Sequence, residues 1–251
     1  MKLCWAHPKF GSVLASCGYD RKVQIWREVA TSSWVAVHEH TAHEASVNSV
    51  DWAPWEHGLI LAAGSSDGCV SVLTRVTEDR WESQKFLAHE SGVTGLSWAS
   101  SGPSSALTEA QRPTLKQFLT GGGDQWVKLW TYSDGSYKAE PLFRHTQWVR
   151  DVAWAPSLGF ARQVAASCSE SGCVMIHSRD NDREQWRHKE VTKLAGPVWR
   201  VSWSVAGSLL AVSASDQVAR LYKETQDGAW ELTSQVNEKG ALVGPEERSS
   251  P

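Results

Sequence analysis

The sequence predicts an all-β fold, an open propeller of five four-stranded units, on three observations. A tryptophan closes a short alternating run five times, at spacings of 46 to 56 residues: Trp5, Trp52, Trp98, Trp154 and Trp203. A strand of small residues follows each run and ends in a tight turn, at Asp20, Asp67, Asp124, Ser171 or Asp216. The sixth residue after each turn is a large one: Trp26, Leu73, Trp130, His177 or Tyr222. Repeats of this period typically build propeller blades.

Each unit is expected to contain four strands, and the second unit shows them most clearly. Its strands are predicted over residues 46–53, 59–66, 69–76 and 81–88, where Val, Ile, Leu and Trp alternate with smaller or polar residues. The SSDG segment between the second and third strands is a hairpin signal. The outer strand of every unit carries an aromatic residue in the same register: Trp34, Trp81, Tyr137, Trp186 and Trp230.

The units are expected to form one domain over residues 1–237. Their approximate bounds are 1–38, 39–85, 86–141, 142–192 and 193–237. Residues 100–116 are rich in Ser, Gly and Pro and predict a surface insertion in the third unit. Residues 238–251 have no strand pattern and predict a disordered tail. The last unit contains its own outer strand and the first has none to spare, so the ring is expected to stay open.

Composition excludes several classes of function. A formal net charge of −3 gives no electrostatic reason for direct binding to nucleic acid or to an anionic membrane. The chain has no apolar run long enough to span a bilayer, and its first residues lack the apolar core of a signal peptide. Four of the five cysteines fall in repeated slots, which predicts buried, reduced thiols. A cytosolic or nuclear protein is expected.

A polar network is expected inside each unit. It combines a histidine before the first strand, a strand hydroxyl, the turn aspartate and a strand tryptophan. The third unit alone has all four of these residues: His89, Thr120, Asp124 and Trp130. The other units keep parts of the network: Asp20 and Trp26, then His43 and Asp67, then His145, then Asp216. The fourth unit has Ser171 and His177 where others have Asp and Trp, and the fifth has Gly196 in place of the histidine.

These groups resemble a catalytic triad, but their degraded repetition favours a structural role. No catalytic residue is therefore predicted. His38, His40 and His43 resemble metal ligands, yet His43 already has its repeat role, so no metal site is predicted. The sequence contains no phosphate-binding or dinucleotide-binding motif, and no cofactor is expected. Trp148 and Trp199 are assigned to equivalent slots at the start of a first strand, where they either cap packing between units or contact a partner.

The units resemble WD repeats, and several stretches narrow the resemblance. These stretches include WAHPKFGSVLASCGYDRKVQIWRE, HEASVNSVDWAP, GGGDQWVKLW and WVRDVAWAPSLG. Over residues 4–237 the chain is similar to the family of the small WD-repeat subunit of the COPII outer coat, which is also a scaffold of the nuclear-pore Y-complex. The alternatives are the paralogous Seh-type nucleoporins, which share the first stretch, and a peptide-binding WD-repeat adaptor.

The resemblance implies a non-enzymatic scaffold with six blades in an open ring. A large α-helical partner, the COPII rod subunit or a Y-complex nucleoporin, would insert a seventh blade. It also implies membership of a nutrient-signalling complex that acts on TORC1. The expected places are ER and COPII vesicle membranes, reached through partners, and the nuclear envelope. Against this pattern the family's first blade is missing, which predicts marginal stability for the isolated chain.

Overall fold

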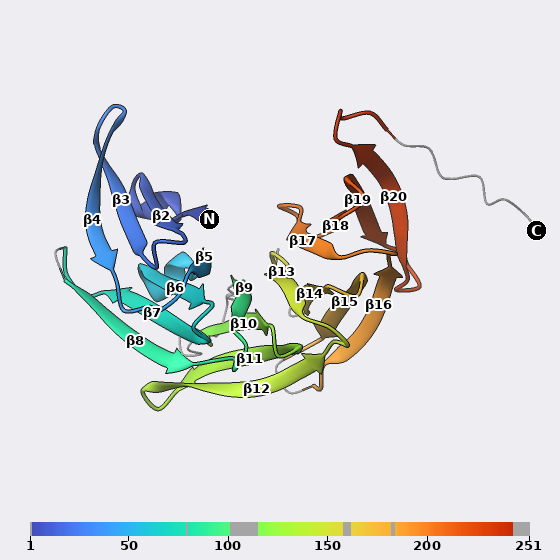
Figure 1. The fold of residues 1–251 in the computed structure, drawn as a ribbon, viewed down its shortest axis with the longest axis horizontal. Coiled ribbons are helices and arrows are strands. Elements are labelled where there is room, and N and C mark those ends of the chain that lie inside the picture. The colour runs from blue at the N-terminus through green and yellow to red at the C-terminus, as the bar shows by residue number, and fades with distance from the viewer. Residues whose placement is uncertain (1, 79, 101–114, 158–161, 182–183, 243–251) are drawn as a thin grey trace, which may run out of the picture.

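Five four-stranded antiparallel sheets form the chain, and they stand around an open ring (Figure 1). The structure is a computed structural model and describes residues 2–78, 80–100, 115–157, 162–181 and 184–242. Each sheet, here called a blade, consists of consecutive strands that run from the centre of the ring outward. A gap separates the first blade from the fifth. The predicted all-β open propeller is confirmed.

The strand bounds follow the repeat. The first blade contains β1 (Lys2–Trp5), β2 (Val13–Cys17), β3 (Val23–Ala30) and β4 (Ser33–His40). The second contains β5 (Val47–Trp52), β6 (Ile60–Ser65), β7 (Cys69–Arg75) and β8 (Trp81–Leu87). The third contains β9 (Val93–Trp98), β10 (Gln117–Gly122), β11 (Trp126–Ser133) and β12 (Ser136–Arg144).

The remaining strands complete two further blades. The fourth contains β13 (Val149–Trp154), β14 (Gln163–Ser169), β15 (Cys173–Arg179) and β16 (Arg187–Lys193). The fifth contains β17 (Val198–Trp203), β18 (Leu209–Ala214), β19 (Val218–Glu224) and β20 (Trp230–Asn237). Two single-turn 3-10 helices, η1 (Pro8–Phe10) and η2 (Trp55–His57), lie between the first and second strands of their blades.

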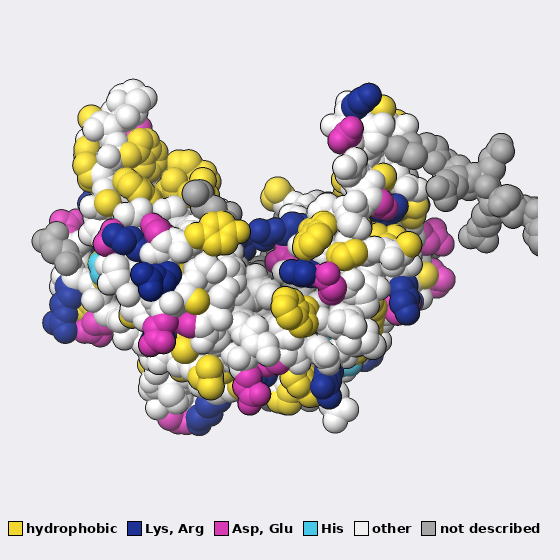
Figure 2. Space-filling model, in the orientation of Figure 1, with side chains coloured by type: hydrophobic (Ala, Val, Ile, Leu, Met, Phe, Trp, Pro, Cys, Tyr) yellow, Lys and Arg dark blue, Asp and Glu magenta, His cyan; other side chains and the backbone are white. Residues whose placement is uncertain are grey.

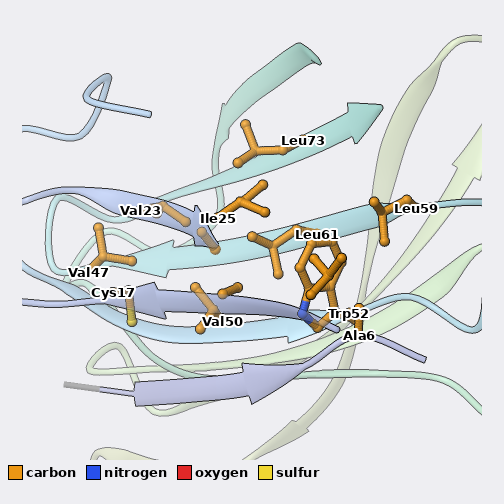
Figure 3. Packing of buried hydrophobic residues seen from close by; sticks show 13 residues of the cluster. Ala6, Cys17, Val23, Ile25, Val47, Val50, Trp52, Leu59, Leu61 and Leu73 are labelled. Atoms are coloured by element: carbon orange, nitrogen blue, oxygen red, sulfur yellow. The ribbon is translucent and has the colours of Figure 1, made fainter. Parts of the chain in front are cut away.

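Face-to-face packing of neighbouring blades forms the core. Between the first and second blades, Val23 and Ile25 on β3 lie in one buried cluster with Val50 and Leu61 of β5 and β6 (Figure 3). Similar clusters join each later pair of blades. Every internal blade therefore buries both of its faces, which explains why the second strands are nearly continuous in hydrophobic and small residues.

Small residues in the second strands set the distance between blades. A Cβ atom added at Gly64 would lie 2.5 Å from Cγ1 of Val93, and one at Gly121 would lie 2.5 Å from Cγ1 of Val149. Each valine is the first residue of the next blade. The glycines therefore allow the following blade to approach closely.

Two predicted segments fall wholly or partly outside the described residues. The structure does not describe residues 101–114 of the predicted insertion or residues 243–251 of the predicted tail. The first residues of that tail turn back, and Leu242 forms an antiparallel bridge with Val236. In the part of the chain that the structure describes, no helix is long and apolar enough to cross a membrane.

The close approach of blades and turns can be tested at Gly68. This glycine has a φ of +83°, and a Cβ there would lie 2.2 Å from the carbonyl oxygen of His89. Gly135 has nearly the same φ, +82°, but nothing within 4 Å of the added atom. We expect Gly135→Ala to lower the free energy of unfolding by about 1 kcal/mol, the cost of left-handed backbone. Gly68→Ala should cost about 2 kcal/mol more through overlap. Urea unfolding measures both, and equal losses would contradict the close approach.

Candidate functional site

The third blade brings together all four residues of its predicted polar network. His89 Nδ1 lies 2.8 Å from Asp124 Oδ1, and His89 Nε2 lies 2.7 Å from Thr120 Oγ1. Trp130 Nε1 donates to the same hydroxyl at 2.9 Å. Burial alone raises the pKa of Asp124, but the hydrogen bonds from His89 and the Trp126 N–H outweigh it and hold that pKa below its usual value. The network ties the turn of the blade to its interior strands.

The second blade keeps only half of this network. His43 Nδ1 lies 3.0 Å from Asp67 Oδ2, and Lys85 and backbone N–H groups also donate to that carboxylate. These donors outweigh burial and hold the pKa of Asp67 well below its usual range. Ala63 stands where the third blade has Thr120. Nε2 of His43 is therefore buried with no hydrogen-bond partner among the described residues.

In the fourth blade a chain of histidines replaces the network. His145 Nε2 lies 2.7 Å from the hydroxyl of Ser167, which lies 2.8 Å from His177 Nε2. On its other side His177 Nδ1 lies 2.9 Å from His188 Nδ1. Sequence reasoning noted the loss of the tryptophan but missed Ser167 and His188. Ser167 could have been found from the sequence, because it aligns with Thr120 of the third blade. Burial lowers the pKa of His145 to about 4 and holds the pKa of His177 well below its usual value.

The first and fifth blades contain the remaining predicted residues without a histidine partner. Trp26 Nε1 donates to Ser16 at 2.9 Å, and Asp20 accepts from the N–H of Lys22 at 3.3 Å. In the fifth blade, Asp216 accepts from the N–H of Val218 at 3.2 Å and from Arg220 at 2.5 Å. These aspartates hold their own turns, as side-chain caps of tight turns do.

The histidine and the hydroxyl of the complete network are buried away from any substrate. The side chains of His89 and Thr120 are 1% and 0% exposed, and both are already hydrogen-bonded. A nucleophile must be accessible to its substrate, so the geometry supports a structural role for these groups. The five cysteines are free, and burial raises the pKa of Cys17 and Cys168. No group of three or more possible metal ligands occurs among the described residues.

The most unusual surface is the side of the first blade that borders the gap. Trp5, Leu14 and Trp26 are register partners across β1, β2 and β3, so they share one side of the sheet. Trp5 also contacts Trp34, with ring centroids 5.5 Å apart. Figure 2 shows hydrophobic side chains gathered on this blade beside the gap. We call this surface the gap face; it comprises Leu3, Trp5, Leu14, Trp26 and Trp34.

Comparison with the other blades shows what is special about the gap face. Leu3 is 59% and Trp5 63% exposed. Their equivalents in the second, third and fourth blades are at most 9% exposed, because each packs against the preceding blade; the pairs are Val50 and Trp52, Leu96 and Trp98, and Val152 and Trp154. The gap face therefore has the residues of a blade interface without the facing blade. An exposed apolar patch of this kind marks an interaction site.

The opposite wall of the gap has a different character. It is the outward side of the fifth blade and presents small or polar residues together with two leucines; among them are Ser202, Leu209, Ala211, Ser213, Ala219 and Leu221. Ser213 occupies the slot of Gly64 and Gly121, where a following blade approaches closely. Both walls of the gap are therefore shaped like blade interfaces.

Trp148 and Trp199 lie at one mouth of the central channel, 51% and 45% exposed. Their assignment to equivalent slots is wrong. Trp148 precedes Val149 whereas Trp199 follows Val198, and strand pairing aligns those two valines, so Trp199 is equivalent to Arg150. The spacing to the strand-end tryptophan agrees, because Trp148 lies six residues before Trp154 and Trp199 lies four residues before Trp203. The two rings line a cavity of about 560 Å³ together with Arg150 and Arg200.

Comparison with known proteins agrees with this architecture. A family model described as WD domain, G-beta repeat matches residues 3–27, 34–72, 81–131, 138–178 and 188–223. The chain is 41% identical to the SEC13 homolog of Drosophila melanogaster over 91% of its own length and 66% of that protein. It is 40% identical to the protein transport protein SEC13 of Cryptococcus neoformans and 42% identical to that of Aspergillus fumigatus. The matches cover 93% and 94% of this chain and 79% and 81% of those proteins.

The incomplete network of the second blade predicts a stabilising substitution. Ala63→Ser would place a hydroxyl where Thr120 and Ser167 stand in their blades, beside the unpaired Nε2 of His43. We expect the free energy of unfolding to rise by about 1 kcal/mol, the usual net value of a buried hydrogen bond. Ala62→Ser is the control, because Ala62 faces the apolar cluster on the other side and its hydroxyl would be buried without a partner. Thermal unfolding that ranks the two variants in the opposite order would contradict the assigned geometry.

The histidine chain predicts a loss of stability in acid. Burial lowers the pKa of His145 from 6.5 to about 4 in the folded chain. The unfolded chain therefore binds the proton first, and stability falls as pH drops through the window from about 6.5 to about 4. In His145→Gln the slope of unfolding free energy against pH in that window should flatten by about one proton. Urea unfolding across the window tests this, with the exposed His7→Gln as control. An unchanged slope in His145→Gln would sink the prediction.

Proposed function

This chain belongs to the WD-repeat family and, within it, to the SEC13 group, and we propose that it is a non-enzymatic scaffold subunit in protein transport. The names of its relatives, which are protein transport proteins, support this assignment. The finer proposal is a subunit of the COPII outer coat that acts in transport from the ER to the Golgi. Because the chain spans 66% to 81% of the three relatives compared above, the activity of the whole protein is carried over only as a proposal.

The observation that carries the proposal is the gap with its two prepared walls. Leu3 and Trp5 are exposed on the gap face although their equivalents in the next three blades are buried. Burying one such side chain contributes about 1.5–3 kcal/mol. A partner that fills the gap with a four-stranded sheet would bury the gap face as each blade buries its neighbour. One donated sheet would cover one wall of the gap, and closing the ring would take a further blade, since this chain has five blades where the resemblance implies six and a donated seventh.

The chemistry of each wall specifies the side chains of a sheet that would cover it. The surface that meets the gap face needs β-branched or leucine residues, as Val23 and Ile25 supply to the second blade. The surface that meets the fifth blade can approach closely, because Ala211 and Ser213 are small. Main-chain pairing is not required of the partner, since neighbouring blades pack by side chains. The interface would therefore resemble a blade interface in size and composition.

Within this proposal the partner is a large α-helical subunit that donates one blade. In the coat this is the COPII rod subunit, and the chain reaches the membrane only through it. The same geometry would serve a Y-complex nucleoporin at the nuclear pore and a TORC1-regulating complex, which the resemblance also implies. In each setting the function is mechanical: a rigid sheet assembly clamps a helical rod and resists its bending.

The test is co-purification of this chain with the blade-donating segment of the COPII rod subunit. We expect Leu3→Asp and Trp5→Ser to reduce the retained partner about tenfold or more, since each places a polar group in an apolar interface. Both side chains are exposed, so the chain itself should stay folded, as circular dichroism would check. Val76→Asp is the matched control, because Val76 is 50% exposed at the end of β7, away from the gap. Retention by both gap-face variants at the unaltered level would refute the proposal.

A further inference from the structure

A β-bulge recurs at the same place in the innermost strand of four blades. The pairing of β5, β9, β13 and β17 with the next strand shifts register directly after the first valine of each. Four residues are left out of the pairing: Asn48, Thr94, Arg150 and Trp199. A bulge re-aims a side chain, and all four residues line the same cavity at the channel mouth.

Two of these side chains latch one blade to the next. Asn48 donates to the carbonyl of Val93 at 2.8 Å, and Thr94 donates to the carbonyl of Val149 at 2.7 Å. Each acceptor is the residue before the bulge of the following blade. In the second and third blades the bulge residue therefore has a structural role: it holds its blade to the next one.

The bulge residues of the fourth and fifth blades make different contacts. Arg150 pairs with Glu170, and its guanidinium lies 4.9 Å from the ring centroid of Trp199 and 5.6 Å from that of Trp148. Such contacts hold the guanidinium against both indole rings. This half of the cavity thus has pre-ordered aromatic and cationic groups in place of the hydrogen bonds that Asn48 and Thr94 make to the next blade.

The charge of the cavity favours an anion. Its lining includes Arg150 and Arg200 and no Asp or Glu. The side chain of Arg200 is 54% exposed, and its closest carboxylate oxygen, on Asp151, lies 3.9 Å away. Arg200 can therefore present a guanidinium fork to a carboxylate. On the face seen in Figure 2, basic and hydrophobic side chains lie together around the centre of the ring.

The same geometry disfavours other ligands. A methylated lysine needs an open aromatic cage, but the guanidinium of Arg150 already lies against both indole rings. Nucleic acid needs several neutralised phosphates, and this chain carries a net charge of −3 with only two arginines in the cavity. An extended peptide with carboxylate and apolar side chains satisfies both the arginines and the half-exposed tryptophans.

We propose that Trp148, Arg150, Trp199 and Arg200 form a channel-mouth site that binds an extended acidic peptide of a partner protein. Arg200 takes a carboxylate of the peptide, while Trp148 and Trp199 take its apolar side chains. Arg150, fixed by Glu170, keeps the two indoles in place. This site and the gap face share no residues, although Arg200 is the register partner of Ser213 in the opposite wall of the gap.

The test uses the full chain and a fluorescein-labelled random copolymer of glutamate and tyrosine, with fluorescence anisotropy as readout. We expect saturable binding that weakens as salt is raised. Arg200→Glu and Trp199→Ala should each weaken it about tenfold or more, because a charge-assisted pair and an aromatic contact are lost. The labelled copolymer of lysine and tyrosine should gain affinity for Arg200→Glu, a change that misfolding could not produce.

Matched controls separate the site from general charge and from the gap. Arg187→Glu makes the same charge change at a side chain that is 63% exposed on β16, and Trp55→Ala removes another partly exposed tryptophan. Both should bind the acidic copolymer like the unaltered chain, as should Leu3→Asp. Absence of binding by the unaltered chain, or equal loss in Arg187→Glu and Arg200→Glu, would overturn the proposal. Because Leu3→Asp reports on the gap face alone, failure of either proposal leaves the other intact.

Discussion

Face-to-face packing of successive blades is the constraint on which the rest of this structure depends. An internal blade is a four-stranded sheet with two apolar sides, and burial of each side against a neighbouring sheet stabilises it. The three internal blades meet this condition with clusters such as that of Val50, Leu61 and Ile25. The first and fifth blades meet it on one side only. Exposure of Leu3 and Trp5 therefore follows from the same rule that buries Val50 and Trp52.

Polar contacts near the channel fix the angle between blades. Asp51 accepts from the N–H of Trp98 at 2.8 Å, and Ser97 accepts from the N–H of Trp154 at 3.1 Å. The indole of Trp52 reaches back to the carbonyl of Cys4 at 3.2 Å, and that of Trp203 to the carbonyl of Ala153 at 3.0 Å. In the second and fifth blades the strand-end tryptophan thus packs and bonds against the preceding blade, whereas Trp98 Nε1 is buried with no hydrogen-bond partner among the described residues. Packing against the preceding blade is what the recurring tryptophans share, and Trp5, which faces the gap, is left as the most exposed of them.

The sequence predicted what depends on spacing within one repeat, but not what depends on neighbouring repeats. The second strand of the second blade was expected over residues 59–66 and is found at Ile60–Ser65, since alternation and turn residues are local signals. His89, Thr120, Asp124 and Trp130 could likewise be assembled from fixed offsets. The slots of Trp148 and Trp199 were misassigned although sequence spacing separates them: Trp148 lies six residues before Trp154, and Trp199 lies four residues before Trp203. The gap face was invisible for another reason: Leu3 and Val50 have the same local pattern, and only the presence or absence of a facing blade distinguishes them.

The two candidate surfaces have a common physical origin. A bulge residue that latches the next blade must be a short donor, as Asn48 and Thr94 are, because the carbonyl it reaches lies close by. Among the described residues, no sheet follows the fifth blade. Its bulge residue therefore has no neighbouring carbonyl to reach, and the large aromatic side chain of Trp199 can occupy this position. Arg150 then gains an indole to lie against. The gap that leaves Leu3 and Trp5 exposed therefore also frees the channel mouth for recognition, and a sheet that fills the gap would bring its own first strand beside Trp199.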